Sequence, residues 1–380
     1  MNIMLYGAAG PGDRNSETLC RAAAGLLRRR YPEARAFLAS DGFDAELPGL
    51  AGYFRHPGAL PPFSRGWLRC AFYKNFLRDE EKYQRLLLAP VIEAGSGMDT
   101  CISLAGSDYR SGLPNRRRVL DRALFERRVR LELWNAAFDP AHSGAEMRRD
   151  LNLFDRIVAG DSISFKALTE NGFGAGTVLL PPLAFALEPQ RAALPEGYSE
   201  GGTVGLCIGP RGDKFFQAVT ALIDHILKST YFSVVLIPYA TAPYGQDGEA
   251  LCRLAGAYKS DPAAGRILSA GNGYNAPETR WLFSRMRMLV TTHTPAAAAA
   301  MAGLTPALLV NSGARARGVM CDTLGDAAEF CLISGAEPSG KDLIRGFSAV
   351  IRNEDAVQAL LHERVPLFRR SLEEGLILHR

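Results

Sequence analysis

The sequence predicts an α/β protein made of two doubly wound, Rossmann-like domains with a central cleft. Short apolar runs alternate with amphipathic runs along the chain, a pattern typical of parallel strands covered by helices on both faces. The chain has 380 residues, more than a single core usually holds, and its 47% hydrophobic and 22% charged content is globular. Prolines and glycines cluster between residues 181 and 202, and the alternation begins again after them.

The first half, residues 1–185, is expected to form the N-terminal Rossmann-like domain. Each predicted strand is a short apolar run, whereas each predicted helix is longer and amphipathic. The predicted strands are 3–6, 100–104, 131–135, 156–159 and 177–180, and the predicted helices are 16–30, 116–130 and 164–171.

Residues 186–202 are expected to link this half to a second Rossmann-like domain, residues 203–380. In the second domain the predicted strands are 204–208, 232–237, 266–268, 288–292 and 307–310. The predicted helices are 214–228, 248–258, 277–286, 295–302 and a last one at 354–374, which could pack back onto the first domain. In such sheets ligands bind beyond the carboxyl ends of the strands, so residues that follow strands are the functional candidates.

Composition and charge argue against several classes of partner. The net charge is +4, and short basic runs with acidic neighbours fit solvated helix faces or a weak attraction to anionic ligands or membrane surfaces. The basic residues lack a recognition motif and an aromatic platform, so we expect no nucleic-acid partner. The seven cysteines form no CxxC pair, and no residue set has the spacing of a metal site.

The expected location is the cytoplasm, or the inner face of the membrane. The first ten residues do not resemble a secretory signal, and no apolar run has the length of a membrane span. An odd, scattered set of cysteines indicates free thiols in a reducing compartment.

Three loops that follow predicted strands in the first half carry candidate residues. The loop 7–13 contains Gly10 and ends in Asp13, and it fits an anion-binding loop or a tight turn into a helix. Asp108 follows the next strand, where it could bind a sugar hydroxyl, act as a base or form a turn. The segment 161–164 has the composition of a helix N-cap.

Two loops in the second half carry cations and a histidine. Arg211 and Lys214 precede a helix, which suits an anionic ligand and a solvated surface equally well. His293 ends the strand 288–292, and Arg315 and Arg317 follow the next strand. A lone histidine is often structural, but one imidazole and two guanidinium groups facing one cleft would suit acid–base work on a phosphorylated or carboxylated ligand.

The order of these motifs resembles that of the polysaccharide pyruvyl transferases. The resemblance extends from residue 3 to about residue 320 and is carried by 10–13, 160–164, 291–293, 303–306 and 312–318. Four positions depart from the family pattern. Gly160 and Thr291 stand where the family usually has arginine, Ser312 replaces a tyrosine, and Arg315 replaces a lysine.

The resemblance implies a fold like that of the GT-B glycosyltransferases, with the acceptor on the first domain and the donor on the second. It implies transfer of a pyruvyl group from phosphoenolpyruvate to a sugar of a cell-surface polysaccharide or its lipid-linked precursor, forming a ketal. The implied partners are this small-molecule donor and a glycan acceptor, with peripheral contact to a membrane-linked glycan and with no cofactor or metal. The implied site has His293 as the catalytic residue, Arg315, Arg317, Arg211 and Lys214 on the donor, and Gly10, Asp13 and Asp108 on the acceptor.

Two other functions fit the same residues. A nucleotide-sugar glycosyltransferase of GT-B type would use the same cleft, glycine loops and basic residues. The segment after 307–310 carries arginines, however, and lacks the glutamate-containing ribose-binding motif expected of that class. A catalytically decayed binding member of the pyruvyl transferase family would account for the replaced arginines.

Overall fold

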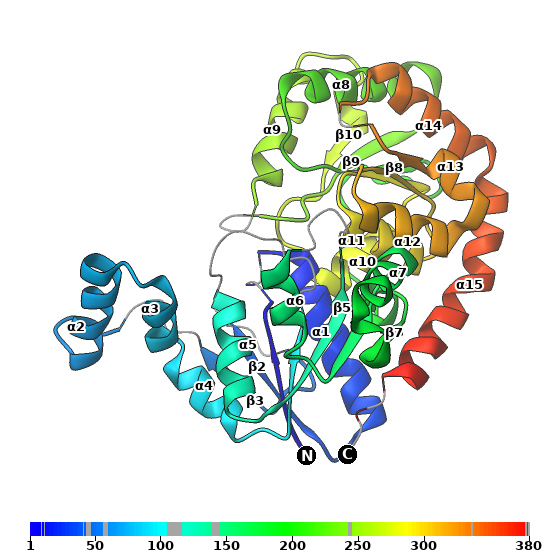
Figure 1. Ribbon diagram of the computed structural model, residues 1–380. Helices are drawn as coiled ribbons and strands as arrows, with labels where there is room; N and C mark the ends of the chain where they lie inside the picture. Colours follow the sequence, from blue (N-terminus) through cyan, green and yellow to red (C-terminus); the bar gives the residue numbers. More distant parts are fainter. Residues whose placement is uncertain are drawn as a thin grey trace. The chain divides into compact units, whose positions relative to one another are not determined.

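The computed structural model describes residues 1–8, 10, 12–40, 42, 47–55, 60–104, 116–138, 144–241, 245–335, 337–376 and 378. The chain divides into two compact units. Unit 1 comprises Met1–Gly10, Leu19–Gly160 and Ser164–Leu180, and unit 2 comprises Pro11–Thr18, Asp161–Ile163 and Pro181–Arg380. Each unit contains one parallel β-sheet with packed helices (Figure 1), which confirms the predicted fold class.

The sheet of unit 1 has seven parallel strands in the order β3-β2-β1-β4-β5-β6-β7. Strands β1 to β3 are added toward one edge of the sheet and β4 to β7 toward the other, so the strand order reverses between β1 and β4, as in a doubly wound fold. The strands are β1 (Asn2–Tyr6), β2 (Arg35–Ser40), β3 (Gly52–Arg55), β4 (Thr100–Ser103), β5 (Arg130–Ala136), β6 (Arg156–Ala159) and β7 (Thr177–Leu179).

Two apolar clusters form the core of unit 1. One packs β1, β4 and β5 against two helices, α4 and α5, and the other packs β5 and β6 against α6 and α7. The helices are α1 (Arg14–Arg30), α2 (Arg65–Ala71), α3 (Glu80–Leu87), α4 (Ala89–Ser96), α5 (Arg116–Glu126), α6 (Ala145–Leu151) and α7 (Ser162–Leu168). A π-helical turn, η1 (Phe72–Leu77), continues α2, and the short turns η4 (Thr169–Phe173) and η5 (Gly174–Gly176) follow α7.

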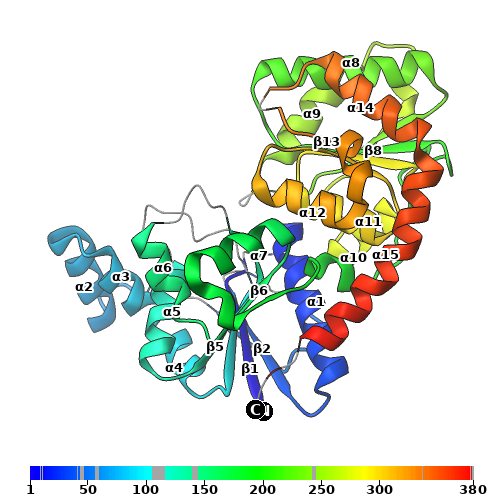
Figure 2. The ribbon, with the colours of Figure 1, turned by 45° about the vertical axis from the view of Figure 1, so that its right-hand side comes forward.

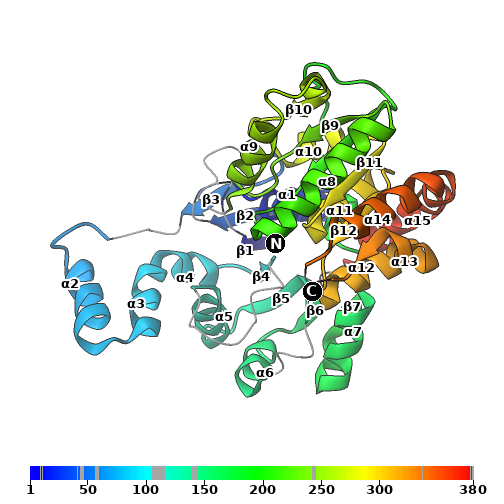
Figure 3. The same cartoon turned by 90° about the horizontal axis from the view of Figure 1, so that it is seen from above.

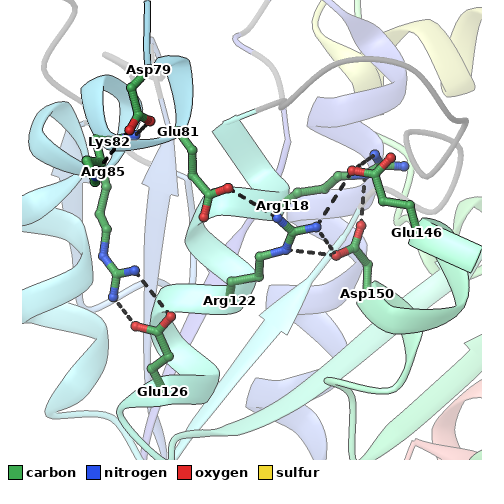
Figure 4. Close-up of polar contacts among 9 residues, drawn as sticks. All are labelled: Asp79, Glu81, Lys82, Arg85, Arg118, Arg122, Glu126, Glu146 and Asp150. Atoms are coloured by element: carbon green, nitrogen blue, oxygen red, sulfur yellow. Dashed lines mark hydrogen bonds and ion pairs between the residues drawn. The ribbon is translucent and has the colours of Figure 1, made fainter. Parts of the chain in front are cut away.

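Ion pairs join α3, α5 and α6 of unit 1 (Figure 4). The Arg118 side chain is 2% exposed and its Nε lies 3.2 Å from a carboxylate oxygen of Asp150, which is 1% exposed. Arg122 binds the other oxygen of Asp150 through Nε and Nη2 at 2.9 and 2.7 Å. The Arg85–Glu126 pair, in contrast, lies at the surface. The buried pair therefore depends on mutual neutralisation, whereas the surface pair has water as an alternative partner.

The sheet of unit 2 has six parallel strands in the order β10-β9-β8-β11-β12-β13, which repeats the connectivity of the first sheet. The reversal falls between β8 and β11. The strands are β8 (Thr203–Cys207), β9 (Ser233–Leu236), β10 (Ile267–Ser269), β11 (Met288–Thr291), β12 (Ala307–Val310) and β13 (Leu332–Ile333).

The helices of unit 2 pack on this sheet and on one another. Figure 2 shows α8 beside α14, and α11 packs on β11 and β12 together with α10, α12 and α15. The helices are α8 (Asp213–Ser229), α9 (Asp247–Ala257), α10 (Ala276–Phe283), α11 (Thr294–Ala302), α12 (Ala314–Leu324), α13 (Ala328–Cys331), α14 (Gly340–Arg352) and α15 (Glu354–Gly375). The short 3-10 turns are η6 (Leu183–Ala186), η7 (Ala264–Arg266) and η8 (Gly325–Ala327). Among the described residues, no helix is both long and apolar enough to cross a membrane.

Helix α11 is short, alanine-rich and buried, and its two ends differ. Arg280 and Arg369 both donate to the carbonyl oxygen of Ala302 at its carboxyl end, at 2.9 and 3.1 Å. Cations at this position satisfy a terminal carbonyl and complement the negative end of the helix dipole. Burial, together with the neighbouring Arg369, lowers the pKa of Arg280 to about 10. The amino end of α11, with its positive dipole, begins directly after His293.

Each predicted strand and helix corresponds to an observed one, but several observed elements were not predicted, among them the helices α2, α3, α4, α6, α12, α13 and α14. Every predicted strand overlaps an observed strand, but β2, β3 and β13 are missing from the prediction. Strand β3 is a half-buried edge strand and β13 has two residues, so neither presents a continuous apolar run. The helix predicted over 116–130 ends at Glu126, because the chain turns through a left-handed conformation at Arg128, with φ 58°.

Candidate functional site

The loops that follow β8, β11 and β12 meet at the carboxyl edge of the unit 2 sheet. The first two flank the reversal of strand order, which is where ligands bind in open α/β sheets. The backbone N–H of Gly209 donates to the Thr292 hydroxyl at 2.9 Å. The amide of Asn311 donates to the carbonyl of Thr292 at 3.3 Å. These bonds hold the three loops in a fixed arrangement.

His293 faces a buried carboxylate from a different loop. Its Nε2 lies 3.0 Å from Oδ2 of Asp247, the first residue of α9, without the alignment of a hydrogen bond. The histidine side chain is 23% exposed, whereas that of Asp247 is 1% exposed. The carboxylate therefore lies within ion-pair distance of the imidazole ring. Nδ1 is the ring nitrogen left for a bound ligand.

Asp247 also shapes the loop that follows β9. Its Oδ2 accepts the backbone N–H groups of Tyr239 and Ala240 at 3.0 and 2.8 Å. The Tyr239 ring lies 5.6 Å from the His293 ring, centre to centre. Burial and the nearby charge of Asp13 raise the pKa of Tyr239 above its usual value, so this phenol stays neutral. One carboxylate therefore binds the loop after β9 and also faces the imidazole.

Gly209 provides the space that this pair requires. A Cβ atom at Gly209 would lie 3.2 Å from Cε1 of His293 and 3.3 Å from Oδ1 of Asp247. These distances are shorter than ordinary van der Waals contact. A larger residue would therefore displace the imidazole or the carboxylate, which explains why glycine suits the end of β8.

The segment 12–18, which belongs to unit 2, packs against the loop after β9. Asp13 forms an isolated antiparallel bridge with Ala240, and Thr241 donates its backbone N–H to the Gly12 carbonyl at 2.8 Å. The Asp13 carboxylate accepts from the backbone N–H groups of Asn15 and Ser16 at 3.1 and 3.3 Å, so it caps α1. The structure thus gives Asp13 the capping role that the sequence left open beside acceptor binding.

Arg211 and Lys214, the two cations predicted near the end of β8, have different surroundings. Arg211 donates from Nη2 to the Val310 carbonyl at 3.0 Å, and its guanidinium lies over the Phe215 ring. This bond places Arg211 at the end of β12, beside the loop that enters α12. Lys214 lies in the first turn of α8 and forms an exposed ion pair with Glu337 at 3.5 Å. Only Arg211 is bonded to the strand edge that also carries His293.

The other two predicted arginines lie in the first turns of α12. Arg315 is partly buried, and burial lowers its pKa while the charge of Asp161 opposes the shift. Arg317 is exposed. Asp161 is buried, and its carboxylate occupies the space that a Cβ atom at Gly318 would need. Arg315 is therefore associated with a carboxylate of the protein, while Arg317 is open to solvent.

The remaining predicted acceptor residues are Gly10 and Asp108. Gly10 is buried and belongs to unit 1. Asp108 lies outside the residues that the structure describes.

A pocket of about 420 Å³ lies beside the histidine pair, at the ends of β9 and β10. Asp247 points to His293, while its neighbours Gln246, Gly248 and Glu249 line the pocket. The opposite wall comes from the ends of the two strands and includes Leu236, Pro238, Ser269 and Asn272. The volume of the pocket is within the range of small-ligand sites.

Comparison with solved structures places this architecture among known enzymes. The chain is similar to Staphylococcus aureus MnaA in a UDP co-structure, with 12% identity, a TM-score of 0.65 and coverage of 98% of this chain and 94% of the other. Anabaena HepE in complex with UDP-glucose shares 14% identity, with a TM-score of 0.60 and 99% coverage of both chains. A UGT transferase from Siraitia grosvenorii in complex with UDP shares 10%, with a TM-score of 0.58 and coverage of 98% and 96%.

At these identities the likeness concerns the fold alone. The chain has a GT-B-type fold, shared with nucleotide-sugar glycosyltransferases and epimerases. No family model matches the chain, and no curated protein matches it in sequence. The fold implied by the motif resemblance is therefore confirmed.

Sequence reasoning missed Asp247 and Tyr239. Asp247 directly precedes the predicted helix 248–258 and follows a predicted strand, which is the position that marks other candidates. The missing information was strand order, because only the sheet brings the ends of β9 and β11 to opposite sides of β8.

Proposed function

We propose that the protein is a nucleotide-sugar glycosyltransferase whose donor binds at the carboxyl edge of the unit 2 sheet. The observation that carries the proposal is His293, which stands at the amino end of a buried helix, beside the reversal of strand order, and faces the buried Asp247 carboxylate. The GT-B-type fold and the UDP or UDP-sugar bound in its neighbours support the nucleotide.

The charge of a diphosphate matches the loops at this edge. Helices α11 and α12 begin after neighbouring strands, so the partial positive charges of their amino ends meet at one edge. Arg211 lies beside them, and Arg317 is exposed in the first turns of α12. The 420 Å³ pocket next to Asp247 would hold the nucleoside.

The reaction breaks the bond between the anomeric carbon and the β-phosphate oxygen and forms a bond from that carbon to an acceptor hydroxyl oxygen. The proton of the hydroxyl passes to the leaving diphosphate. In this proposal His293 donates a hydrogen bond from Nδ1 to the departing phosphate, while Asp247 lies beside Nε2 of the same ring. A fixed donor aimed at developing charge typically contributes about 10²–10³ in rate.

Thermal unfolding with UDP, UDP-glucose and UDP-N-acetylglucosamine tests this proposal. A ligand at about 100 times its Kd stabilises the folded state by about 2.7 kcal/mol, which is a rise of several degrees in Tm. Arg211→Ala should abolish most of the rise, and the control Lys214→Ala should retain it because Lys214 pairs with Glu337 at the surface. No shift with any nucleotide, in a folded protein, would overturn the proposal.

The same samples distinguish transfer from epimerisation. Release of UDP from a UDP-sugar in the presence of an acceptor, followed by ³¹P NMR, indicates transfer. Conversion of a UDP-sugar into a second UDP-sugar without release indicates the epimerase chemistry of other proteins with this fold.

Pyruvyl transfer stays as a second proposal, favoured by the order of the His293 and Arg315 motifs. Phosphoenolpyruvate carries a phosphate and a carboxylate, and would also require cations at this edge. A Tm rise with phosphoenolpyruvate that disappears in Arg315→Ala, without any rise with UDP, would favour it over the glycosyltransferase.

A further inference from the structure

Exposed aromatic and aliphatic side chains gather on α2 and η1 of unit 1. Eleven large hydrophobic side chains are exposed among the described residues, and five of them lie between residues 63 and 77. Phe63 and Phe76 are 83% and 82% exposed. Together with four cations of the same segment, these residues form what we call the aromatic–basic patch: Phe63, Leu68, Phe72, Phe76, Leu77, Arg65, Arg69, Lys74 and Arg78.

Several apolar side chains of the patch are neighbours in space. Leu68, Phe72 and Phe76 recur every four residues, and the Phe72 and Phe76 rings stack with centroids 5.8 Å apart. The Phe63 ring lies 5.4 Å from that of Trp67. Helix α2 contacts η1 and α3, and it lies on the side of α3 away from the unit 1 sheet (Figures 1 and 3). The apolar face is therefore outside the core.

The cations of the patch stand in a segment that contains no acidic residue. Residues 60–78 contain four basic and no acidic residues. Among the described residues, no ion pair or hydrogen bond joins the side chains of Arg65, Arg69, Lys74 and Arg78 to an acid. Directly beyond the patch the pattern changes, since Lys82 pairs with Asp79 at 3.1 Å.

We propose that the aromatic–basic patch docks the protein on an anionic lipid bilayer. A helix that lies in the membrane interface needs apolar rings to enter the headgroup region and cations to meet the lipid phosphates. Five large apolar side chains gain nothing from exposure to water, and four cations in a segment without acidic residues favour an anionic surface. The bilayer meets both requirements at once. The proposal does not depend on the identity of the donor.

A neighbouring pocket fits the same contact. It has a volume of about 340 Å³ and is lined by Arg69 and Tyr73 from the patch side and by Lys82, Arg85 and Arg127. Three of these cations are paired with acids, so Arg69 is the one available to a phosphate. An anionic headgroup would enter beside it while the rings insert in the acyl boundary.

Co-sedimentation of the full chain with vesicles tests the proposal. One vesicle is pure phosphatidylcholine and the other is phosphatidylcholine mixed with phosphatidylglycerol. The wild type should sediment with the anionic vesicle only, and raised salt should release it. Arg65→Gln with Arg69→Gln should weaken partitioning about 25-fold, at about fivefold per cation. Phe63→Ser with Phe76→Ser should also release the protein.

Matched variants control for folding and net charge. Phe125→Ser removes an exposed ring from α5 outside the patch, and Lys228→Gln with Lys259→Gln removes the same charge from unit 2. Both should bind vesicles like the wild type, and all variants should keep the wild-type Tm because the altered side chains are exposed.

Three outcomes would overturn the proposal. The first is no binding to anionic vesicles, and the second is binding that neither patch variant weakens. The third is a wild type that self-associates without lipid while Phe63→Ser with Phe76→Ser is monomeric by light scattering, which would make the patch an interface between copies of the chain.

Discussion

Replacement of Asp247 tests the candidate site most directly. Its Oδ2 accepts two backbone N–H groups, from Tyr239 and Ala240, and its side chain is 1% exposed. A hydrogen bond to a charged acceptor contributes about 1.5–3 kcal/mol. Asp247→Ala removes both and is expected to lower the free energy of unfolding by about 3–6 kcal/mol. Asp247→Asn retains an oxygen acceptor for both N–H groups, and neutral bonds are about half as strong, so its cost is expected to be about half.

Hydrogen exchange measured by mass spectrometry is the appropriate assay, because it resolves the peptides of β9 and α9 from those of unit 1. Protection factors convert to a local free energy of opening. Asp213→Ala is the control, since its side chain is 77% exposed and pairs with Arg253 at the surface. That variant is expected to stay within about 0.5 kcal/mol of the wild type.

The loss in local free energy of opening should be largest for Asp247→Ala, smaller for Asp247→Asn and smallest for Asp213→Ala. If Asp247→Ala stays within about 1 kcal/mol of the wild type, the carboxylate does not hold the loop after β9 and the argument fails. Asp247→Asn has a second use, because it keeps the loop and removes the charge beside His293. Under the proposed function it should lose turnover while it remains folded and still binds nucleotide.

Three further predictions concern single residues. Asp150→Ala removes the buried carboxylate that pairs with both Arg118 and Arg122 and should cost about 3–5 kcal/mol in urea unfolding. Glu126→Ala at the surface pair should cost at most about 1 kcal/mol, and equal costs would contradict the role of burial. Burial raises the pKa of Glu132, so the folded state holds its proton more tightly than the unfolded state, and this carboxyl destabilises the fold as pH rises from the ordinary value of about 4.3 through the folded pKa. Glu132→Gln should therefore raise Tm at neutral pH and lose this advantage below about pH 4, and a gain that is the same at both pH values would count against this account. Gly209→Ala introduces a Cβ atom 3.2 Å from the His293 ring, so it should cost about 1–3 kcal/mol and lower kcat more than it raises KM, and unchanged kcat would argue against His293 as the group that contacts the phosphate.

Much of the fold could be predicted because its local signals are strong. The strands β8, β11 and β12 are short apolar runs that are buried on both faces, and long amphipathic helices such as α8 separate them. The candidate loops follow from the same rule, since residues after parallel strands share one edge of the sheet. The edge strand β3 was not predicted, because a half-buried strand lacks a continuous apolar run.

The contacts within the site could not be predicted to the same degree. Arg315 and Arg317 are two residues apart on one helix, yet the first is partly buried near Asp161 and the second is exposed. Arg211 and Lys214 are three residues apart, yet only Arg211 bonds to the end of β12. The position of each residue around its helix and the packing of neighbouring elements decide which side chain is buried or bonded. Composition encodes neither of these two properties.

The sequence by itself determined two parallel α/β halves and the edge at which His293 stands, because hydrophobic periodicity and chain order are local properties. The tertiary structure decided which side chain meets that histidine. Asp247 lies 46 positions before His293 in the chain and reaches it only because β8 lies between β9 and β11 in the sheet. Pairing between distant strands is a cooperative outcome of burying both faces of the sheet, so no local pattern records it.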